Sequence, residues 1–245
     1  MNEKIKEYGL KETVFKNSTG LDEEGHYSSA YDMAIVAKEL LKHEEVLKYS
    51  SVYEDYLRVN TPNKFWLVNT NKLVRFYEGA DGLKTGFTDA AGYCMTVTSK
   101  RAGMRLIAVV LGEKVSKTRN EETTELLDYG FNLYKINLLK KKTDLIDKIK
   151  IEKGTKESVG IYPKVDISIL MKKSDAMINY DTEVKMNDIK LPIKKGDIVG
   201  KLLLKDNGKT IKEVELVTSE DISKINYFKY LWNSFTELIS GEIKD

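Results

Sequence analysis

The stretch Gly79-Ala80-Asp81-Gly82-Leu83-Lys84-Thr85-Gly86-Phe87-Thr88-Asp89 joins an Asp-Gly turn to a lysine, a threonine and a glycine in direct succession. An alternating apolar run follows over residues 93–98, so the pattern predicts a turn that leads into one strand of a hairpin. Side chains alternate between the two faces of a strand. Lys84 and Gly86 should therefore share one face, and Thr85 should lie on the other.

These three residue types suit a site that binds an anion. The Lys84 ammonium would raise the positive potential of a groove, and the Thr85 hydroxyl could donate a hydrogen bond to a carboxylate. Gly86 has no side chain, so a ligand could lie against the backbone there. The tripeptide also arises by chance, and on its own it is a weak signal.

A longer set of segments surrounds this tripeptide. Lys-Thr-Gly is a motif of penicillin-binding proteins and class A β-lactamases, which also carry Ser-x-x-Lys. Residues 15–21, 26–34, 81–88 and 91–93 resemble, in order and spacing, the serine-type D-alanyl-D-alanine carboxypeptidases (peptidase family S11). These are the low-molecular-mass penicillin-binding proteins of bacterial cell-wall maturation, and the resemblance runs along the whole chain. It implies removal of the terminal D-alanine from the pentapeptide stem of peptidoglycan.

The resemblance also implies roles for particular residues. Lys84 would supply positive potential, Thr85 would bind the carboxylate of the departing D-alanine, and the Phe87 amide N–H would be one oxyanion donor. Gly86 completes the motif that binds the substrate. Arg119 aligns, by count from Lys84, with an arginine that relatives place behind the groove, where it would help to attract the terminal carboxylate. The alternative is a surface arginine.

The same resemblance extends to the segment 69–73, which corresponds to a stretch that faces the groove from the side in relatives. Within it, some relatives carry an arginine where Thr70 falls. The resemblance implies no cofactor, and it implies β-lactams as further ligands of the full-length enzyme.

Two motifs of the family are absent from these 245 residues. No serine is followed three places later by a lysine, and no Ser-x-Asn occurs. In the family, the serine of Ser-x-x-Lys attacks the carbonyl between two D-alanines. The two histidines, His26 and His43, indicate no Ser-His-Asp substitute. We therefore expect the chain to be the C-terminal portion of such an enzyme, and expect the literal 245 residues not to turn over.

Other functional classes compete with this interpretation. The chain could be a non-catalytic fragment that docks on peptidoglycan or a membrane, or half of a split enzyme whose N-terminal piece is encoded separately. A β-lactamase shares Lys-Thr-Gly, but residues 87–245 include a β-rich domain and an amphipathic tail that β-lactamases lack.

Composition narrows the choice further. With 40 basic and 38 acidic residues the chain is too balanced to indicate a nucleic-acid partner. Cys94 is the single cysteine, which excludes an internal disulfide, and its apolar run favours a small core residue over a nucleophile. The acids of 22–24 with His26 are adjacent rather than spaced on one face, which favours a solvated loop over a metal site.

Export and membrane signals give mixed indications. Residues 1–8 are charged and lack the apolar core of a signal peptide, and no run of 18 apolar residues could span a membrane. The family that the chain resembles is nevertheless extracytoplasmic and membrane-associated.

Three parts are predicted along the chain. Residues 1–138 should form an incomplete α/β domain of the β-lactamase and transpeptidase type, with helices from Ser28 or Ser29 to about His43 and over 117–133. A lysine-rich stretch at 135–150 marks a boundary. The pattern over residues 139–220 predicts short strands joined by glycine-containing turns, and therefore a small all-β domain.

The third part, residues 221–245, has the spacing of an amphipathic helix. Its apolar face would carry Ile225, Phe228, Leu231, Trp232 and Phe235. Such a helix could lie in a membrane interface, as a similar tail does in relatives, or it could pack on its own domain or on a partner.

Overall fold

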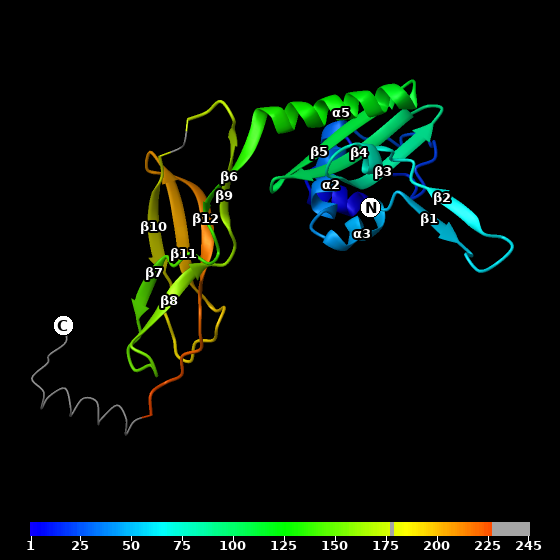
Figure 1. Cartoon of the computed structure of the whole chain (residues 1–245). Helices are drawn as coiled ribbons and strands as arrows, with labels where there is room; N and C mark the ends of the chain where they lie inside the picture. The colour runs from blue at the N-terminus through cyan, green and yellow to red at the C-terminus, as the bar shows by residue number, and fades with distance from the viewer. Residues whose placement is uncertain (177–178, 227–245) are drawn as a thin grey trace, which may run out of the picture. The chain divides into compact units, whose positions relative to one another are not determined.

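A computed structural model describes residues 1–176 and 179–226 (Figure 1). The chain divides into two compact units. Unit 1 comprises Met1–Ile136 with Lys172–Ser174, and unit 2 comprises the remaining described residues.

Unit 1 is built on a three-stranded antiparallel sheet in the order β3-β4-β5. The strands are Ala80–Thr88, Gly92–Arg101 and Met104–Glu113, which confirms the strand and hairpin expected from the sequence. The turn between β4 and β5 is Ala102-Gly103, whose φ values of 46° and 79° suit a tight hairpin turn. β3, which carries Lys-Thr-Gly, is an edge strand of this sheet.

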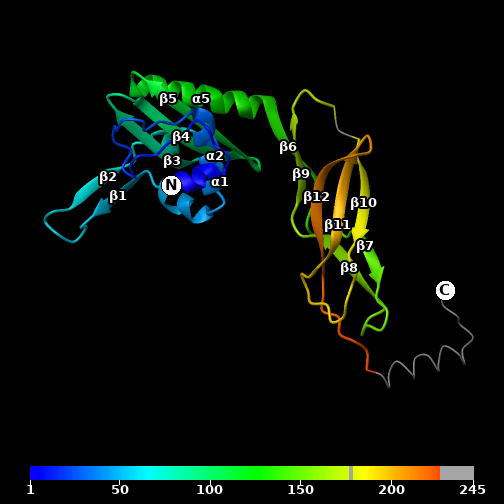
Figure 2. The same cartoon turned by 180° about the vertical axis from the view of Figure 1, so that it is seen from behind.

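Three helices accompany this sheet: α1 (Asn2–Glu7), α2 (Ala30–Leu40) and α5 (Ser116–Leu133). Both cartoon views show α5 along one face of the sheet and α2 against the other (Figures 1 and 2). The Ser29 hydroxyl accepts a hydrogen bond from the amide of Asp32 at 3.2 Å, so the predicted N-cap of α2 is confirmed.

The core of unit 1 lies between α5 and the sheet. At Gly130 of α5, a Cβ atom would lie 2.6 Å from Leu106 Cδ1, so the helix can approach the sheet closely only because this residue lacks a side chain. The buried apolar residues of this core are Leu73, Tyr77, Met95, Val97, Met104, Ala108, Leu127 and Phe131.

The segment before β3 forms a hairpin and short helical turns. Strands β1 (Glu54–Leu57) and β2 (Phe65–Val68) make a separate two-stranded sheet, as the aromatic and β-branched pattern predicts. Figure 2 shows this hairpin extending away from the β3-β4-β5 sheet. The short helices are a 3₁₀ turn at Glu44–Val46, α3 (Leu47–Ser50) and α4 (Leu73–Phe76).

Unit 2 is all-β, as expected. Its main antiparallel sheet has the order β10-β11-β12-β8-β7, and β6 (Tyr134–Lys140) pairs with β9 (Ile167–Lys172) in a second sheet. The strands of the main sheet are β7 (Asp147–Lys150), β8 (Ser158–Pro163), β10 (Asp181–Met186), β11 (Ile198–Asp206) and β12 (Lys209–Thr218). Alternate residues of β8, β11 and β12 form its apolar core.

The expected start of the tail helix at residue 221 is wrong. Residues 221–226 are extended: Ile222 pairs with Ile193 and Lys224 pairs with Gly154. Ile222 is fully buried in the core of unit 2, and the Ile225 amide donates to the Lys153 carbonyl at 2.8 Å. Helical spacing misassigned these residues because a short apolar pattern fits a strand equally well.

The other residues of the proposed membrane face, Phe228, Leu231, Trp232 and Phe235, lie outside the described residues. In the part that the structure describes, no helix combines the length and apolar character needed to cross a bilayer.

We expect Leu216→Ala to lower the free energy of unfolding by about 2–5 kcal/mol, because the side chain is completely buried in the core of unit 2. Ile211→Ala, on the same strand but 41% exposed, is the control and should cost only about 0.5 kcal/mol. Urea denaturation of both variants measures the difference. Equal losses in the two variants would contradict the assignment of this core.

Candidate functional site

The Lys-Thr-Gly strand has the predicted alternation. Lys84 and Gly86 are exposed, whereas Thr85 is buried, with 8% of its surface accessible. Thr85 is paired with Met95 and shares the face of β3 that turns toward α5. Lys84 lies on the opposite face, and its ammonium donates to the Thr85 carbonyl.

Thr85 shares a hydrogen bond with Thr70, whose hydroxyl oxygen lies 2.6 Å from its own. The neighbours of Thr70 hold it in place. The buried side-chain amide of Asn71 donates to the Gly82 carbonyl at 3.0 Å, and the backbone N–H of Asn71 donates to Asn69 Oδ1 at 2.8 Å. Two hydroxyls that share one hydrogen bond use one proton, so the second O–H stays available for a ligand. The segment 69–73 thus contacts the motif strand, as its resemblance implies.

An ion pair fixes the start of β3. The Asp81 carboxylate receives two hydrogen bonds of 2.8 Å from the Arg105 guanidinium, which also donates to the fully buried Thr98 hydroxyl at 2.8 Å. Because Asp81 is on β3, Thr98 on β4 and Arg105 on β5, the pair ties all three strands together. Sequence reasoning missed it, since the register that aligns these residues is not visible in the sequence.

The Asp-Gly turn has a steric reason as well. The Ser50 hydroxyl donates to the Asp81 carbonyl at 2.8 Å, and a Cβ atom at Gly82 would lie 2.5 Å from that hydroxyl oxygen. Glycine therefore lets the segment that ends α3 approach the entry to the motif strand.

Arg119 is buried, with 5% of its surface accessible, so the alternative of a surface arginine is wrong. Its guanidinium donates to Asn120 Oδ1 at 2.9 and 3.2 Å and lies 5.8 Å from the centre of the Tyr93 ring. Burial lowers the pKa of Arg119 below its usual range. Within residues 1–176 and 179–226, no carboxylate lies within 4.0 Å of it. Arg119 is thus a desolvated cation that has no acidic partner here.

Tyr93 links Arg119 to the motif strand. The rings of Phe87 and Tyr93 lie 4.3 Å apart between centroids, on directly paired residues of β3 and β4. The structure therefore brings Phe87 and Arg119 together through Tyr93, and Thr85 together with Thr70. Lys84 and Gly86 lie on the other face of the strand.

Cys94 is only half-buried and lies outside the core clusters of the described residues, so its expected place in the core is wrong. It pairs directly with Gly86, and its thiol points to the Ala91 carbonyl at 3.4 Å. The pairing of β4 with β5 shifts register at this residue, between Tyr93 and Met95.

The histidines are not arranged for catalysis. His43 is exposed, and His26 packs edge-on against Phe15 at 5.7 Å, with its Nδ1 lacking a hydrogen-bond partner among the described residues. In the described part of the chain, no group of three or more His, Cys, Asp or Glu is placed to hold a metal. The acidic loop has another contact, because Asp22 accepts a 2.6 Å hydrogen bond from Thr88 at the end of β3.

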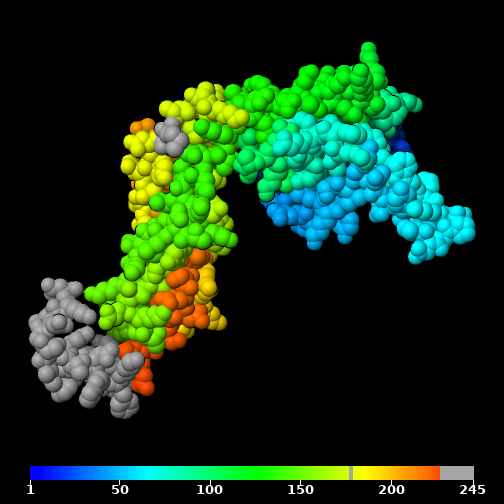
Figure 3. Space-filling view, viewed as in Figure 1, coloured from blue at the N-terminus to red at the C-terminus, as the bar shows by residue number. Residues whose placement is uncertain are grey.

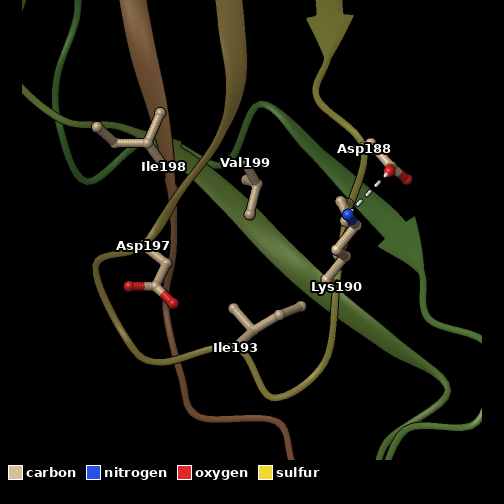
Figure 4. A pocket seen from close by; sticks show the side chains of 7 residues that line it. Asp188, Lys190, Ile193, Asp197, Ile198 and Val199 are labelled. Carbon is tan, nitrogen blue, oxygen red and sulfur yellow. Dashed lines mark ion pairs between the residues drawn. The ribbon is translucent and has the colours of Figure 1, made fainter.

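A pocket of about 470 Å³ lies in unit 2 and is lined by none of these residues (Figure 4). It is lined by residues 188–190, Ile193 and 197–199. Asp188 and Lys190 form an exposed ion pair of 4.0 Å, and Asp197 accepts from the Lys194 amide at 2.8 Å. These are the contacts of a surface loop, and the residues that line the pocket include no serine, threonine, cysteine or histidine.

The Lys-Thr-Gly motif, here on an edge strand of a helix-flanked antiparallel sheet, is shared by penicillin-binding proteins and class A β-lactamases. Residues 1–115 match the family described as D-alanyl-D-alanine carboxypeptidase, peptidase S11, and residues 134–224 match the penicillin-binding protein 5 C-terminal domain. The chain belongs to this D-alanyl-D-alanine carboxypeptidase family.

Individual relatives agree with this assignment. D-alanyl-D-alanine carboxypeptidase DacF of Bacillus subtilis is 49% identical over 94% of this chain and 60% of its own length. The crystal structure of penicillin binding protein 5 from Haemophilus influenzae is 30% identical with a TM-score of 0.60, covering 91% of this chain and 64% of that one. A peptidoglycan synthesis regulatory factor from Streptococcus pneumoniae is 25% identical with a TM-score of 0.66, covering 89% and 67%. The chain spans about 60% of the curated relatives that it matches.

We expect Asp81→Ala to destabilise unit 1 by about 1.5–3 kcal/mol, because it leaves the largely buried Arg105 guanidinium without its charged partner. Lys117→Ala removes an exposed ion pair with Glu121 and is the control, with a loss of at most about 0.5 kcal/mol. Urea denaturation measures both. A loss in Asp81→Ala no larger than in the control would show that the pair does not hold β3.

Proposed function

We propose that unit 1 is the substrate-binding part of a serine-type carboxypeptidase that removes the terminal D-alanine from the stem peptides of peptidoglycan. The observation that carries the proposal is the Lys84-Thr85-Gly86 motif on an edge strand, in a chain of this family. An edge strand leaves N–H and C=O groups unpaired on one side, so an extended peptide can lie along β3 and hydrogen-bond to its backbone.

In this proposal the substrate's terminal carboxylate is recognised by hydroxyl and cation together. The O–H that Thr85 and Thr70 do not use between themselves donates to the carboxylate. Arg119 contributes positive potential, since no carboxylate of the described residues lies within 4.0 Å of it, and burial keeps this potential from being fully screened. Lys84 would supply positive potential on the other face of the strand, and the Phe87 backbone N–H would be one oxyanion donor.

The attacking hydroxyl is a separate matter. Nucleophilic catalysis needs an activated hydroxyl and a base within hydrogen-bond reach, and these 245 residues hold neither Ser-x-x-Lys nor Ser-x-Asn. We propose that this chain alone binds the peptide without turning it over, and that other residues supply the nucleophile. Action on peptidoglycan implies an extracytoplasmic location, with membrane association through residues 227–245 as part of the same proposal.

We expect the purified 245-residue chain to give no covalent adduct with a fluorescent penicillin, because the serine that would be acylated is missing. Gel fluorescence after denaturation is the measurement, and the full-length Bacillus subtilis relative is the positive control. A labelled band from the 245-residue chain would overturn the proposed lack of turnover.

We expect Thr85→Val to weaken reversible binding of an acetylated peptide ending in D-Ala-D-Ala by about tenfold or more, because a charge-assisted hydrogen bond is worth about 1.5–3 kcal/mol. Isothermal titration or NMR titration measures the affinity. Lys100→Ala, which removes an exposed cation near the β4–β5 turn, should leave binding unchanged. Absence of peptide binding by the unmodified chain would favour a docking fragment instead.

A further inference from the structure

The β1–β2 hairpin carries two exposed aromatic rings side by side. Tyr56 and Trp66 are directly opposite one another across the strands, so both side chains lie on the same face of the hairpin. Directly opposed residues have Cβ atoms about 4.5–5.5 Å apart. Tyr56 and Trp66 are 43% and 55% exposed, and we refer to their two rings together as the aromatic face.

Polar groups flank the aromatic face at both ends. At one end, the Trp66 indole N–H donates to Glu54 at 3.2 Å, and the other carboxylate oxygen of Glu54 lies 3.8 Å from the Arg75 guanidinium. At the other end, the Lys64 ammonium lies 4.0 Å from the centre of the Tyr56 ring. The rings therefore have hydrogen-bonding groups along their edges, and these contacts restrict the orientation of both rings.

The aromatic face lies outside the hydrophobic core of unit 1. Neither ring belongs to a core cluster of the described residues, and Figure 3 shows the hairpin, in cyan, projecting into solvent. An isolated two-stranded sheet is only marginally stable in water. Two large aromatic side chains exposed together on such a hairpin indicate a surface that binds something.

We propose that the aromatic face binds the glycan strand of peptidoglycan, a polymer of β-linked N-acetylated amino sugars. This rests on the proposed function, since it adds a site for the sugar part of the same substrate. A sugar ring has an apolar C–H face surrounded by hydroxyl and acetamido groups. The rings of Tyr56 and Trp66 can stack on the apolar face of the sugar and bury it, while Glu54, Lys64 and Arg75 can hydrogen-bond to the polar groups around the sugar ring.

The contact between Lys64 and Tyr56 does not prevent a sugar from binding to the Tyr56 ring. An exposed cation–π contact is worth about 0.5–1 kcal/mol, so replacing it with a sugar ring costs little. The released ammonium can donate to the bound sugar instead.

A lipid surface fits the hairpin less well than a glycan. Its tip, residues 58–64, contains Arg58 and Lys64 and three further polar side chains, and Asp55 lies on the opposite face. Inserting this tip into a bilayer would remove these groups from water without partners. A glycan, by contrast, meets the side of the hairpin and leaves the tip solvated.

The aromatic face is close along the chain to the proposed peptide site. Trp66 lies four residues before Thr70, whose hydroxyl contacts Thr85. Four residues span at most about 14 Å, and an extended stem of five residues spans at most about 18 Å. A single stem peptide is thus long enough to join a sugar on the aromatic face to a terminal carboxylate at Thr85.

The test is titration of the 245-residue chain with a soluble hexamer of N-acetylglucosamine, followed calorimetrically. We expect Trp66→Ala to lower the affinity at least tenfold. Phe65→Ala is the matched control, because Phe65 is the adjacent aromatic residue of the same strand, is 54% exposed and faces the opposite side. Thermal unfolding of both variants verifies that the rest of unit 1 remains folded.

The hexamer has no peptide, and the D-Ala-D-Ala ligand has no sugar, so this proposal and the proposed function fail separately. No binding of the hexamer, or an equal loss in Phe65→Ala, would overturn the glycan proposal. So would a Trp66→Ala variant that loses binding to phosphatidylglycerol vesicles while hexamer affinity is unchanged.

Discussion

The paired hydrogen bonds between Asp81 and Arg105 are the constraint on which the site of unit 1 depends. Bidentate pairs of this kind are strong and geometrically specific. Arg105 also bonds the buried Thr98 hydroxyl, so one side chain sets the positions of β3, β4 and β5 at the point where the chain enters the motif strand. The register of Lys84, Thr85 and Gly86 against β4 follows from that anchor.

Much of this arrangement can be predicted from the sequence because the signals are local. The Asp-Gly turn, the alternation after it and the apolar hairpin give β3, β4 and β5, and Ser29 caps α2 as expected. Family resemblance predicts that residues 69–73 lie beside the groove, and in the structure Thr70 of this segment shares a hydrogen bond with Thr85. Neither depends on knowing which residues meet across the sheet.

The features that the sequence does not show are non-local. The Asp81–Arg105 pair joins residues on strands that are not neighbours in the sheet. Arg119 contacts the ring of Tyr93, which lies 26 positions earlier in the chain. The two errors share a cause as well. Apolar periodicity placed Cys94 in the core and Ile222 in a helix, whereas Cys94 lies opposite Gly86 on the other face of β4 from the buried Met95, and Ile222 forms a β-bridge with Ile193.

The end of unit 2 has a mechanical consequence. Residues 222–225 run between two parts of the chain, with hydrogen bonds to Ile193 on one side and to Lys153 and Thr155 on the other. Tension applied at residue 226 would act on these four backbone hydrogen bonds and on the buried Ile222 side chain. The end of unit 2 can therefore separate from the rest of the unit only if these bonds break and Ile222 leaves the core.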